Sequence, residues 1–141
     1  MKFDELKEMI ETDSKLDISK LDKDALHVPY LQGKYINKHS VENGKLKRLE
    51  LELKKLKFKK YQYYSGKATG AEYQAKPLDH TILKTDVQRY IDGDAEIFEL
   101  ENRILTQKMK VDAISEFVKA LGQRTYLIKS AIDYLKFTNG V

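Results

Sequence analysis

The sequence predicts an all-α fold, built from elongated helices and helical hairpins that associate as a homo-oligomer. Apolar residues recur at helical spacing through most of the chain, and the last third keeps a heptad pattern. The charged share of 34% is high and the hydrophobic share of 41% is slightly low, which is typical of helices with much solvated surface. Such helices bury their apolar stripes against each other or against a second protomer.

Length and composition limit the class of protein. With 141 residues the chain suffices for one ordinary domain. It contains no cysteine, which excludes disulfides and thiolate metal sites and favours a reducing cytoplasm. The first residues, MKFDELKEMIETD, are amphipathic and acidic, unlike a signal peptide, and no stretch approaches the roughly 20 apolar residues of a membrane span.

The first third predicts two short helices and a break. Apolar residues at helical spacing indicate a helix over Lys2–Thr12, and the Asp- and Ser-rich segment after it is typical of a connector. Ser19 or Asp22 is expected to cap a second helix that runs through Leu26. Pro29 is expected to break that helix or to begin the next one, because proline lacks an N–H and fixes φ.

The central segment has two possible interpretations. Leucines at alternating steps of three and four form an a/d seam that continues to Lys60 and Tyr63: Leu46, Leu49, Leu53 and Leu56. The same stretch also alternates like a strand through Leu49, Leu51 and Leu53. We favour the helix, because Leu, Lys and Glu are good helix formers and poor strand formers.

The second half predicts a loop, a short element and two long helices. Ser65–Lys76 is expected to be a flexible loop, and Thr81–Ile91 a short helix or an irregular connection. Asp92-Gly93-Asp94 is expected to end that element and to supply an N-cap for the following helix. Gly122 stands where that helix is expected to end, and Arg124–Phe137 repeats the helical pattern.

We divide the chain into residues 1–80, a helical region with a basic helix and a flexible loop, and residues 81–141, a helical oligomerisation region. Both belong to one structural unit. The apolar stripes of the last two helices exceed what short partner helices cover, so we expect contacts with another protomer. The candidate oligomerisation residues are Ile114, Val118, Leu121, Ile128 and Leu135.

Positive charge is concentrated between Lys45 and Lys60, where eight basic residues face two glutamates and three tyrosines follow. The local charge of +6 exceeds the +4 of the whole chain. Lysine-rich helix faces are usually only solvated surface, but this density and the aromatic rings fit single-stranded nucleic acid. Tyr63 lies on the seam and is expected in the core. We therefore expect residues 1–80 to bind single-stranded DNA through the basic helix and the flexible loop. The candidate DNA-binding residues are Lys54, Lys55, Lys57, Lys59, Lys60, Tyr61, Tyr64 and Lys67.

No catalytic constellation is visible in the sequence. None of the three histidines is paired at i, i+4 or lies in an HExxH motif. Tyr61 stands where a phosphate-binding loop before Lys67 needs its first glycine, and Ala68 follows the lysine. Asp92, Asp94 and Glu96 resemble the start of a calcium loop, but Ile97 occupies the position where its sharp turn requires glycine. We expect a protein that is not an enzyme and uses no cofactor or metal.

Several motifs, in order, resemble one known family. Asn37-Lys38-His39-Ser40, a Leu/Lys/Glu helix and Tyr63-Tyr64-Ser65-Gly66, followed by Lys67 and Gly70, are similar to the UvsY family of recombination mediators of T-even-type bacteriophages. Leu83-Lys84-Thr85 follows the loop as in that family. The resemblance covers most of the chain and is most specific between Asn37 and Gly70.

The resemblance implies a non-enzymatic ring, hexameric or heptameric, in the cytoplasm of an infected bacterial host. Proteins of this family bind single-stranded DNA and help a RecA-like, UvsX-like recombinase replace the phage single-strand-binding protein. The family's basic DNA-contacting positions lie just before the Tyr-Tyr-Ser-Gly motif. Lys60 retains its charge there, whereas Phe58 stands where the family has a basic residue, and Lys57 and Lys59 flank it.

The alternative is a helical scaffold or adaptor whose basic face binds protein partners or an anionic membrane surface. The tyrosines distinguish the two only weakly. Membrane-surface helices need a broad apolar face, and here that face is largely committed to the seam.

Overall fold

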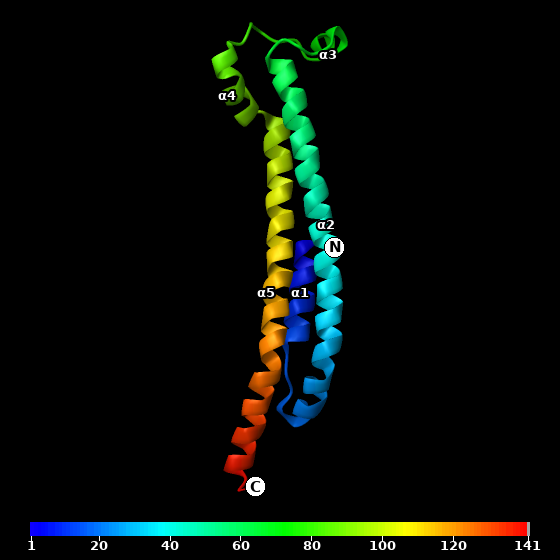
Figure 1. Cartoon of the computed structure of the whole chain (residues 1–141), viewed down its shortest axis with the longest axis vertical. Helices are drawn as coiled ribbons and strands as arrows, with labels where there is room; N and C mark the ends of the chain where they lie inside the picture. Colours follow the sequence, from blue (N-terminus) through cyan, green and yellow to red (C-terminus); the bar gives the residue numbers. More distant parts are fainter. Residues whose placement is uncertain (141) are drawn as a thin grey trace. The chain divides into compact units, whose positions relative to one another are not determined.

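The computed structural model describes residues 1–140, and within them every regular element is a helix. Figure 1 shows the elements in chain order, which are α1 (Phe3–Ser14), α2 (Leu21–Tyr64), α3 (Gly70–Ala75), α4 (Val87–Asp92) and α5 (Ala95–Thr138). Short 3-10 turns over Ile18–Lys20 and Lys84–Asp86 precede α2 and α4. The all-α prediction is confirmed, and so is the helical interpretation of the central leucine segment. None of the described helices is long and apolar enough to cross a membrane.

The chain forms two compact units, and α2 and α5 each contribute to both. The first unit contains Met1–Asn43 together with the chain from Lys108 onward, and the second contains Gly44–Gln107. This grouping rests on contacts within the chain, so it does not test the division by function at residue 80, which stays a prediction.

The core of the first unit joins α1, the beginning of α2 and the middle of α5. It consists of Leu6, Leu31, Tyr35, Ile114, Phe117 and Leu121. The rings of Tyr35 and Phe117 meet edge to face, with centroids 4.7 Å apart. The buried Tyr35 hydroxyl donates a hydrogen bond to Oδ2 of Asp13 at 2.7 Å, so the core tyrosine has its polar atom satisfied.

The second unit pairs the end of α2 with the beginning of α5. Residues later in α2 contact residues earlier in α5, since Lys57 pairs with Glu101 while Lys60 pairs with Asp94. The two helix segments are therefore antiparallel. Buried Val87, Ile91 and Ile97 form the core of this unit, and the half-buried residues packed against them are Leu53, Leu56, Tyr64 and Ile82.

Two expected helix breaks are absent. Pro29 lies inside α2, which runs from Leu21 to Tyr64. Gly122 lies inside α5 and does not have the positive φ of a helix-ending glycine. The two helices predicted on either side of Gly122 are therefore one continuous helix. Both residues disfavour a helix, glycine by about 1 kcal/mol relative to alanine. Burial of Leu31 and Tyr35 after the proline, and of Leu121 and Ile128 around the glycine, outweighs this cost.

The expected flexible loop over Ser65–Lys76 contains the short helix α3. Thr69 begins it, and its hydroxyl accepts a hydrogen bond from the N–H of Glu72 at 3.4 Å. The expectation for Thr81–Ile91 was better, because this segment holds a 3-10 turn and α4.

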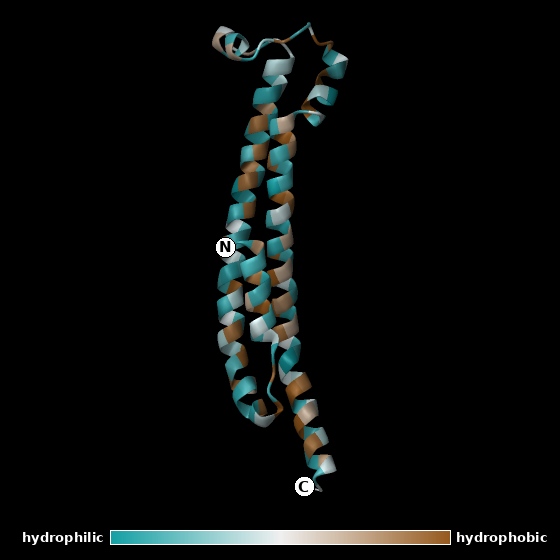
Figure 2. Ribbon diagram, turned by 180° about the vertical axis from the view of Figure 1, so that it is seen from behind, coloured by the Kyte–Doolittle hydropathy of each residue, from teal (hydrophilic) through white to brown (hydrophobic). Residues whose placement is uncertain are grey.

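The candidate oligomerisation residues occupy a different environment from the one expected. Ile114 and Leu121 are in the core of the first unit, Val118 packs against that core, Ile128 is buried and Leu135 is half-buried. We therefore correct the assignment of Ile114, Leu121 and Ile128 to a seam between protomers, since one chain already covers them. The end of α5 instead exposes other large side chains with apolar surface: Tyr126, Leu127, Tyr134 and Phe137. In Figure 2 the last turns of this helix, before the C-terminus, include brown, hydrophobic segments.

Candidate nucleic-acid interface

Four of the candidate DNA-binding lysines on α2 are exposed to solvent: Lys54, Lys55, Lys57 and Lys59. Lys57 lies 3.6 Å from Oε1 of Glu101. The other three, and exposed Lys67 in the loop after α2, form no ion pair with any residue between 1 and 140. Their charge is therefore not neutralised within the described chain, and it is available to an anionic ligand.

Two aromatic side chains are exposed beside these lysines on α2. Tyr61 is 40% exposed, and the ammonium group of Lys67 lies 6.0 Å from the centre of its ring. Phe58 is 63% exposed. Our choice of site residues from the sequence included Tyr61 and omitted Phe58. The signal that would have found Phe58 is its position off the leucine seam, among lysines.

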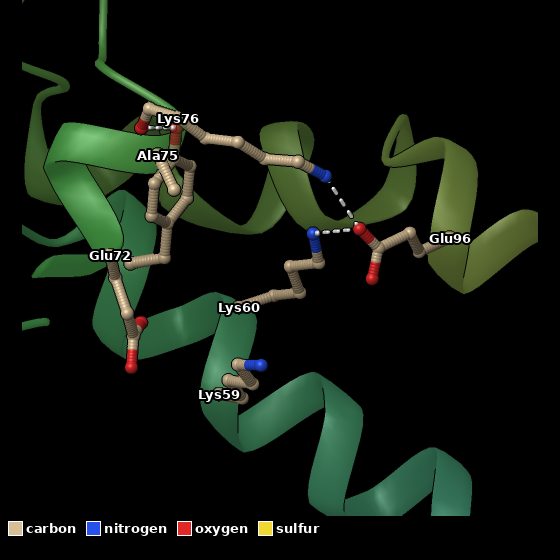
Figure 3. Close-up of a pocket in the computed structure, with 7 residues that line it drawn as sticks. Lys59, Lys60, Glu72, Ala75, Lys76 and Glu96 are labelled. Atoms are coloured by element: carbon tan, nitrogen blue, oxygen red, sulfur yellow. Dashed lines mark hydrogen bonds and ion pairs between the residues drawn. The ribbon is translucent and has the colours of Figure 1, made fainter.

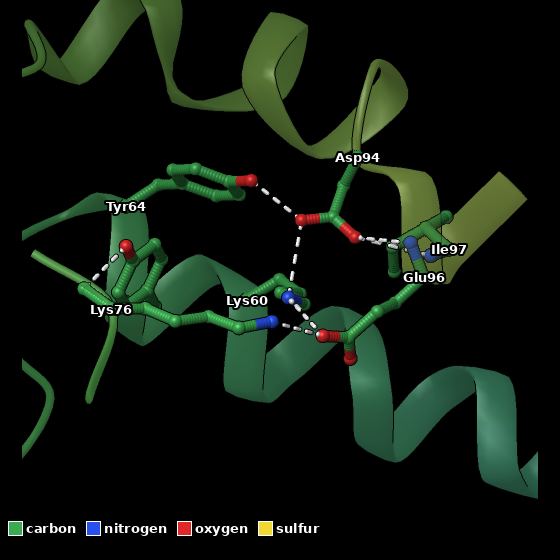
Figure 4. A network of polar contacts seen from close by, with 7 residues as sticks. Lys60, Tyr64, Lys76, Asp94, Glu96 and Ile97 are labelled. Atoms are coloured by element: carbon green, nitrogen blue, oxygen red, sulfur yellow. Dashed lines mark hydrogen bonds and ion pairs between the residues drawn. The ribbon is translucent and has the colours of Figure 1, made fainter. Parts of the chain in front are cut away.

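Lys60 differs from the neighbouring lysines because it is buried. Its Nζ lies 3.2 Å from Oδ2 of Asp94 and 3.3 Å from Oε1 of Glu96, as Figure 4 shows. Lys76 approaches the same Glu96 oxygen at 2.8 Å. Lys60 is thus part of a network that joins α2 to α5, and a phosphate would reach it only by breaking these ion pairs. We therefore remove Lys60 from the set of freely available lysines.

Asp94 is the centre of this network. Its Oδ1 accepts hydrogen bonds from the N–H groups of Glu96 and Ile97, at 2.9 and 3.1 Å, at the beginning of α5. The prediction that Asp92-Gly93-Asp94 supplies the cap of this helix is confirmed, and Asp94 is the capping residue. Its Oδ2 accepts a hydrogen bond from the hydroxyl of Tyr64 at 2.5 Å in addition to the ion pair with Lys60.

The network sets the pKa values of its members. Burial alone would raise the pKa of the Asp94 carboxyl, but the hydrogen bonds from Tyr64 and Ile97 and the charge of Lys60 outweigh burial and lower it. Hydrogen bonds from Lys76 and Lys60 lower the pKa of Glu96. Burial, followed by the hydrogen bond to Asp94, raises the pKa of Tyr64. Asp94 and Glu96 are thus held ionised and Tyr64 neutral.

The tyrosines at the end of α2 have roles other than those we expected. Tyr64, a candidate for base stacking, packs on the core of the second unit and bonds Asp94. Tyr63, expected in the core, is half-buried and stacks on Tyr73 with ring centres 5.4 Å apart. The Tyr63 hydroxyl donates a hydrogen bond to the carbonyl oxygen of Lys76 at 2.7 Å, and the Tyr73 hydroxyl donates one to the carbonyl oxygen of Tyr63 at 2.7 Å. Both Tyr63 and Tyr64 therefore stabilise the fold, and Tyr61 is the exposed tyrosine of the three.

A pocket of about 190 Å³ lies beside the network. Figure 3 shows its lining, which is made up of Lys59, Lys60, Tyr63, Glu72, Ala75, Lys76 and Glu96. Lys60 and Lys76 both point to Glu96 inside it, so a carboxylate already neutralises part of its positive charge. Among residues 1–140 there is no cluster of three or more His, Cys, Asp or Glu side chains that could hold a metal ion.

The fold is that of a known group of recombination proteins. The chain matches crystal structures of the bacteriophage T4 recombination mediator protein UvsY, in lattice type II with a TM-score of 0.85 and 23% identity over 99% of this chain and 98% of that one. In lattice type III the TM-score is 0.74, with 22% identity over 99% of both chains. At these identities the structural match establishes the all-α fold.

The sequence comparisons identify the family. The family model described as "Recombination, repair and ssDNA binding protein UvsY" matches residues 9–141. "Recombination protein uvsY" of Enterobacteria phage T4 is 25% identical over 140 residues, which is 99% of this chain and 99% of that protein. The chain therefore belongs to the UvsY family, and its role is that of a recombination mediator.

Proposed function

We propose that this mediator binds single-stranded DNA through the exposed face of α2 in the second unit and the adjoining loop. The observation that carries the proposal is the set of exposed lysines without an ion-pair partner in the described chain, Lys54, Lys55 and Lys59, next to the exposed ring of Tyr61. Lys57 and Lys67 extend this set. These residues define the basic face of α2.

Binding of DNA to the basic face of α2 is mainly electrostatic. Each lysine that neutralises a phosphate releases counterions, so affinity falls with salt, by about 0.7 in log–log slope for each phosphate contacted on a single strand. Stacking of bases on an exposed aromatic ring adds affinity without choosing among bases.

The mediator function then follows from assembly. We propose a homo-oligomer, a hexamer or heptamer, in which several basic faces hold one strand and raise avidity by roughly 10²–10⁴. A strand held at several points is bent or stretched, which weakens the grip of the phage single-strand-binding protein. A RecA-like, UvsX-like recombinase then occupies the strand. We further propose that the protein acts in the cytoplasm of the infected host, is not an enzyme, and needs no metal or cofactor.

The test compares two triple substitutions with equal loss of charge. K54A/K55A/K59A removes the lysines of the basic face, and K15A/K20A/K23A removes three exposed lysines of the first unit. Affinity for a labelled oligonucleotide is measured by fluorescence anisotropy at several salt concentrations. We expect the first variant to bind all sequences more weakly and its salt slope to flatten by about 2, and the second to match the unmodified protein.

A competition arm separates DNA binding from the scaffold alternative. Anionic liposomes are added to the complex with the oligonucleotide. Weak displacement together with loss of affinity only in K54A/K55A/K59A supports the proposal. Equal loss in both triple variants, or binding that is indifferent to salt, would overturn it.

A further inference from the structure

Phe58 is the most exposed large apolar side chain on the basic face of α2. It is 63% exposed and belongs to neither hydrophobic cluster of the described chain. At 100° per residue, Phe58 points away from the side of α2 that carries buried Lys60 and half-buried Leu53. The fold therefore makes no use of this ring.

The neighbours of Phe58 on the helix surface are the residues of the proposed DNA interface. Lys54 and Lys55 lie four and three positions before it, and Tyr61 lies three positions after it. Side chains at these spacings are surface neighbours on a helix, with Cβ atoms about 5–6 Å apart. A strand whose phosphates contact Lys54 and Lys55 therefore passes over both exposed rings.

We propose that Phe58 is a base-stacking residue of this interface and that it acts together with Tyr61. The inference rests on the proposed function, because it needs a single strand on the basic face of α2. Phe58 carries no hydrogen-bonding or charged group, so its contribution is stacking on the face of any base. Its contribution to affinity is consequently independent of salt, unlike that of the lysines.

Leu51 provides the matched control. It lies seven positions before Phe58 on the same face and is 61% exposed, so it has similar exposure and hydrophobicity but no aromatic ring. If the exposed apolar side chains on this face served a protein contact, substitution of either residue would disturb assembly. If the ring of Phe58 stacks on bases, only its loss weakens DNA binding.

The first experiment measures the affinity of the full chain for a labelled oligothymidylate with F58A, L51A and K55A. We expect F58A to weaken binding roughly 5- to 140-fold, the range of stacking on one base, with an unchanged salt slope. K55A should flatten the slope by about 0.7, and L51A should bind like the unmodified protein. Sedimentation of each variant reports whether assembly has changed.

The second experiment uses the absence of tryptophan from the sequence. F58W and L51W each introduce a single tryptophan, whose fluorescence is quenched when a base stacks on it. We expect oligothymidylate to quench the emission of F58W and to protect it from acrylamide, while the emission of L51W stays unchanged. F58W should also retain the affinity that F58A loses, because tryptophan keeps a stacking surface.

The outcomes separate the two proposals. If the unmodified protein binds DNA but F58A binds equally well and F58W is not quenched, the role of Phe58 is wrong and the basic face of α2 stands. If F58A and L51A both alter sedimentation, the ring serves a protein contact and the inference is overturned. If the unmodified protein does not bind single strands, both proposals fail.

Discussion

The hydroxyl of Tyr64 lies 2.5 Å from Oδ2 of Asp94, so the last residue of α2 holds the carboxylate that caps α5. Tyr64→Phe removes this hydrogen bond and keeps the ring against the core. A hydrogen bond to a charged group contributes about 1.5–3 kcal/mol, so the free energy of unfolding in urea should fall by about that amount. Affinity for single-stranded DNA should not change.

Tyr61→Phe is the matched control for Tyr64→Phe. It removes a hydroxyl from a 40% exposed tyrosine of the same helix, so the free energy of unfolding should change by no more than about 0.5 kcal/mol. Equal stability of the two variants would show that the Tyr64 hydroxyl contributes nothing to folding. The sequence-based role of Tyr64 in stacking would then regain support if Tyr64→Ala lost DNA affinity without loss of stability.

Lys60 and Lys55 should respond in opposite ways to the same substitution. Lys60→Met keeps an apolar stem but leaves buried Asp94 without its cation, which typically costs about 3–5 kcal/mol when a buried ion pair loses one partner. Lys55→Met changes an exposed residue and should leave stability within about 0.5 kcal/mol while weakening DNA binding. Urea denaturation and anisotropy on the same preparations measure both effects.

A double substitution distinguishes the ion pair from packing. If the cost of Lys60→Met comes from the unpaired carboxylate, Asp94→Asn in the same chain should restore part of the lost stability. Additive losses would instead assign the effect of Lys60→Met to its packing.

The pH dependence of the free energy of unfolding in acid should reflect the same network of ion pairs and hydrogen bonds. The pKa values of Asp94 and Glu96 are lower in the folded chain than their usual values of about 4, so their ionisation stabilises the fold above that range. Protonation removes this stabilisation as the pH falls through the folded pKa values. We expect a free energy of unfolding that is flat between about pH 7 and 5 and decreases below about pH 4.

Asp94→Asn should reduce both the stability at neutral pH and the steepness of its loss in acid, since the titrating group is gone. Glu99→Gln removes an exposed carboxylate of the same helix that pairs with no lysine or arginine among residues 1–140, and should leave the pH profile unchanged. Urea denaturation at a series of pH values makes the comparison. Identical profiles for Asp94→Asn and the unmodified chain would contradict the assignment.

Features that depend on local sequence could be predicted well. The helical type of the central segment follows from residue propensities and spacing, and the Asp94 cap follows from its place before an apolar helical pattern. The breaks expected at Pro29 and Gly122 failed because packing of distant residues overrides a local preference of a few kcal/mol.

The different environments of Tyr63 and Tyr64 from those expected have a geometric cause. A strict heptad seam has a period of 3.5 residues and, continued from Leu56 and Lys60, reaches Tyr63. A straight α-helix has a period of 3.6, and the difference accumulates to about 20° per heptad. In the structure, the inward positions after Leu56 are Lys60 and Tyr64.

The sequence alone also could not show which lysines lack an ion-pair partner in the fold. Lys59 and Lys60 are neighbours of the same type, but Lys60 is buried and pairs with Asp94 at the beginning of α5, whereas Lys59 is exposed. The basic face of α2 was thus predictable as a region, but its membership depends on tertiary contacts. The same holds for Phe58, whose exposure depends on the rotation of α2 against its neighbours.

If α5 takes part in assembly, the exposed side chains near its end, and not the buried ones, should form the contact between protomers. Ile128 is buried within the chain, so Ile128→Glu should unfold the first unit instead of separating protomers. Phe137 and Tyr134 are 85% and 67% exposed, so Tyr134→Glu with Phe137→Glu should leave the protomer folded. In an interface the two carboxylates would be buried without partners at a cost of several kcal/mol, which is enough to dissociate a ring held by weak repeated contacts. If avidity provides the affinity, this double variant should bind long single strands much more weakly and lose less on an oligonucleotide that spans one basic face.

Lys129→Glu is the control for this double variant. It changes an exposed charge of the same helix, lies off the apolar face, and should affect neither assembly nor DNA affinity. Sedimentation and anisotropy on one sample decide the matter: a double variant that stays assembled places the contact elsewhere, and a folded monomer with full affinity for long strands excludes the multivalent mechanism.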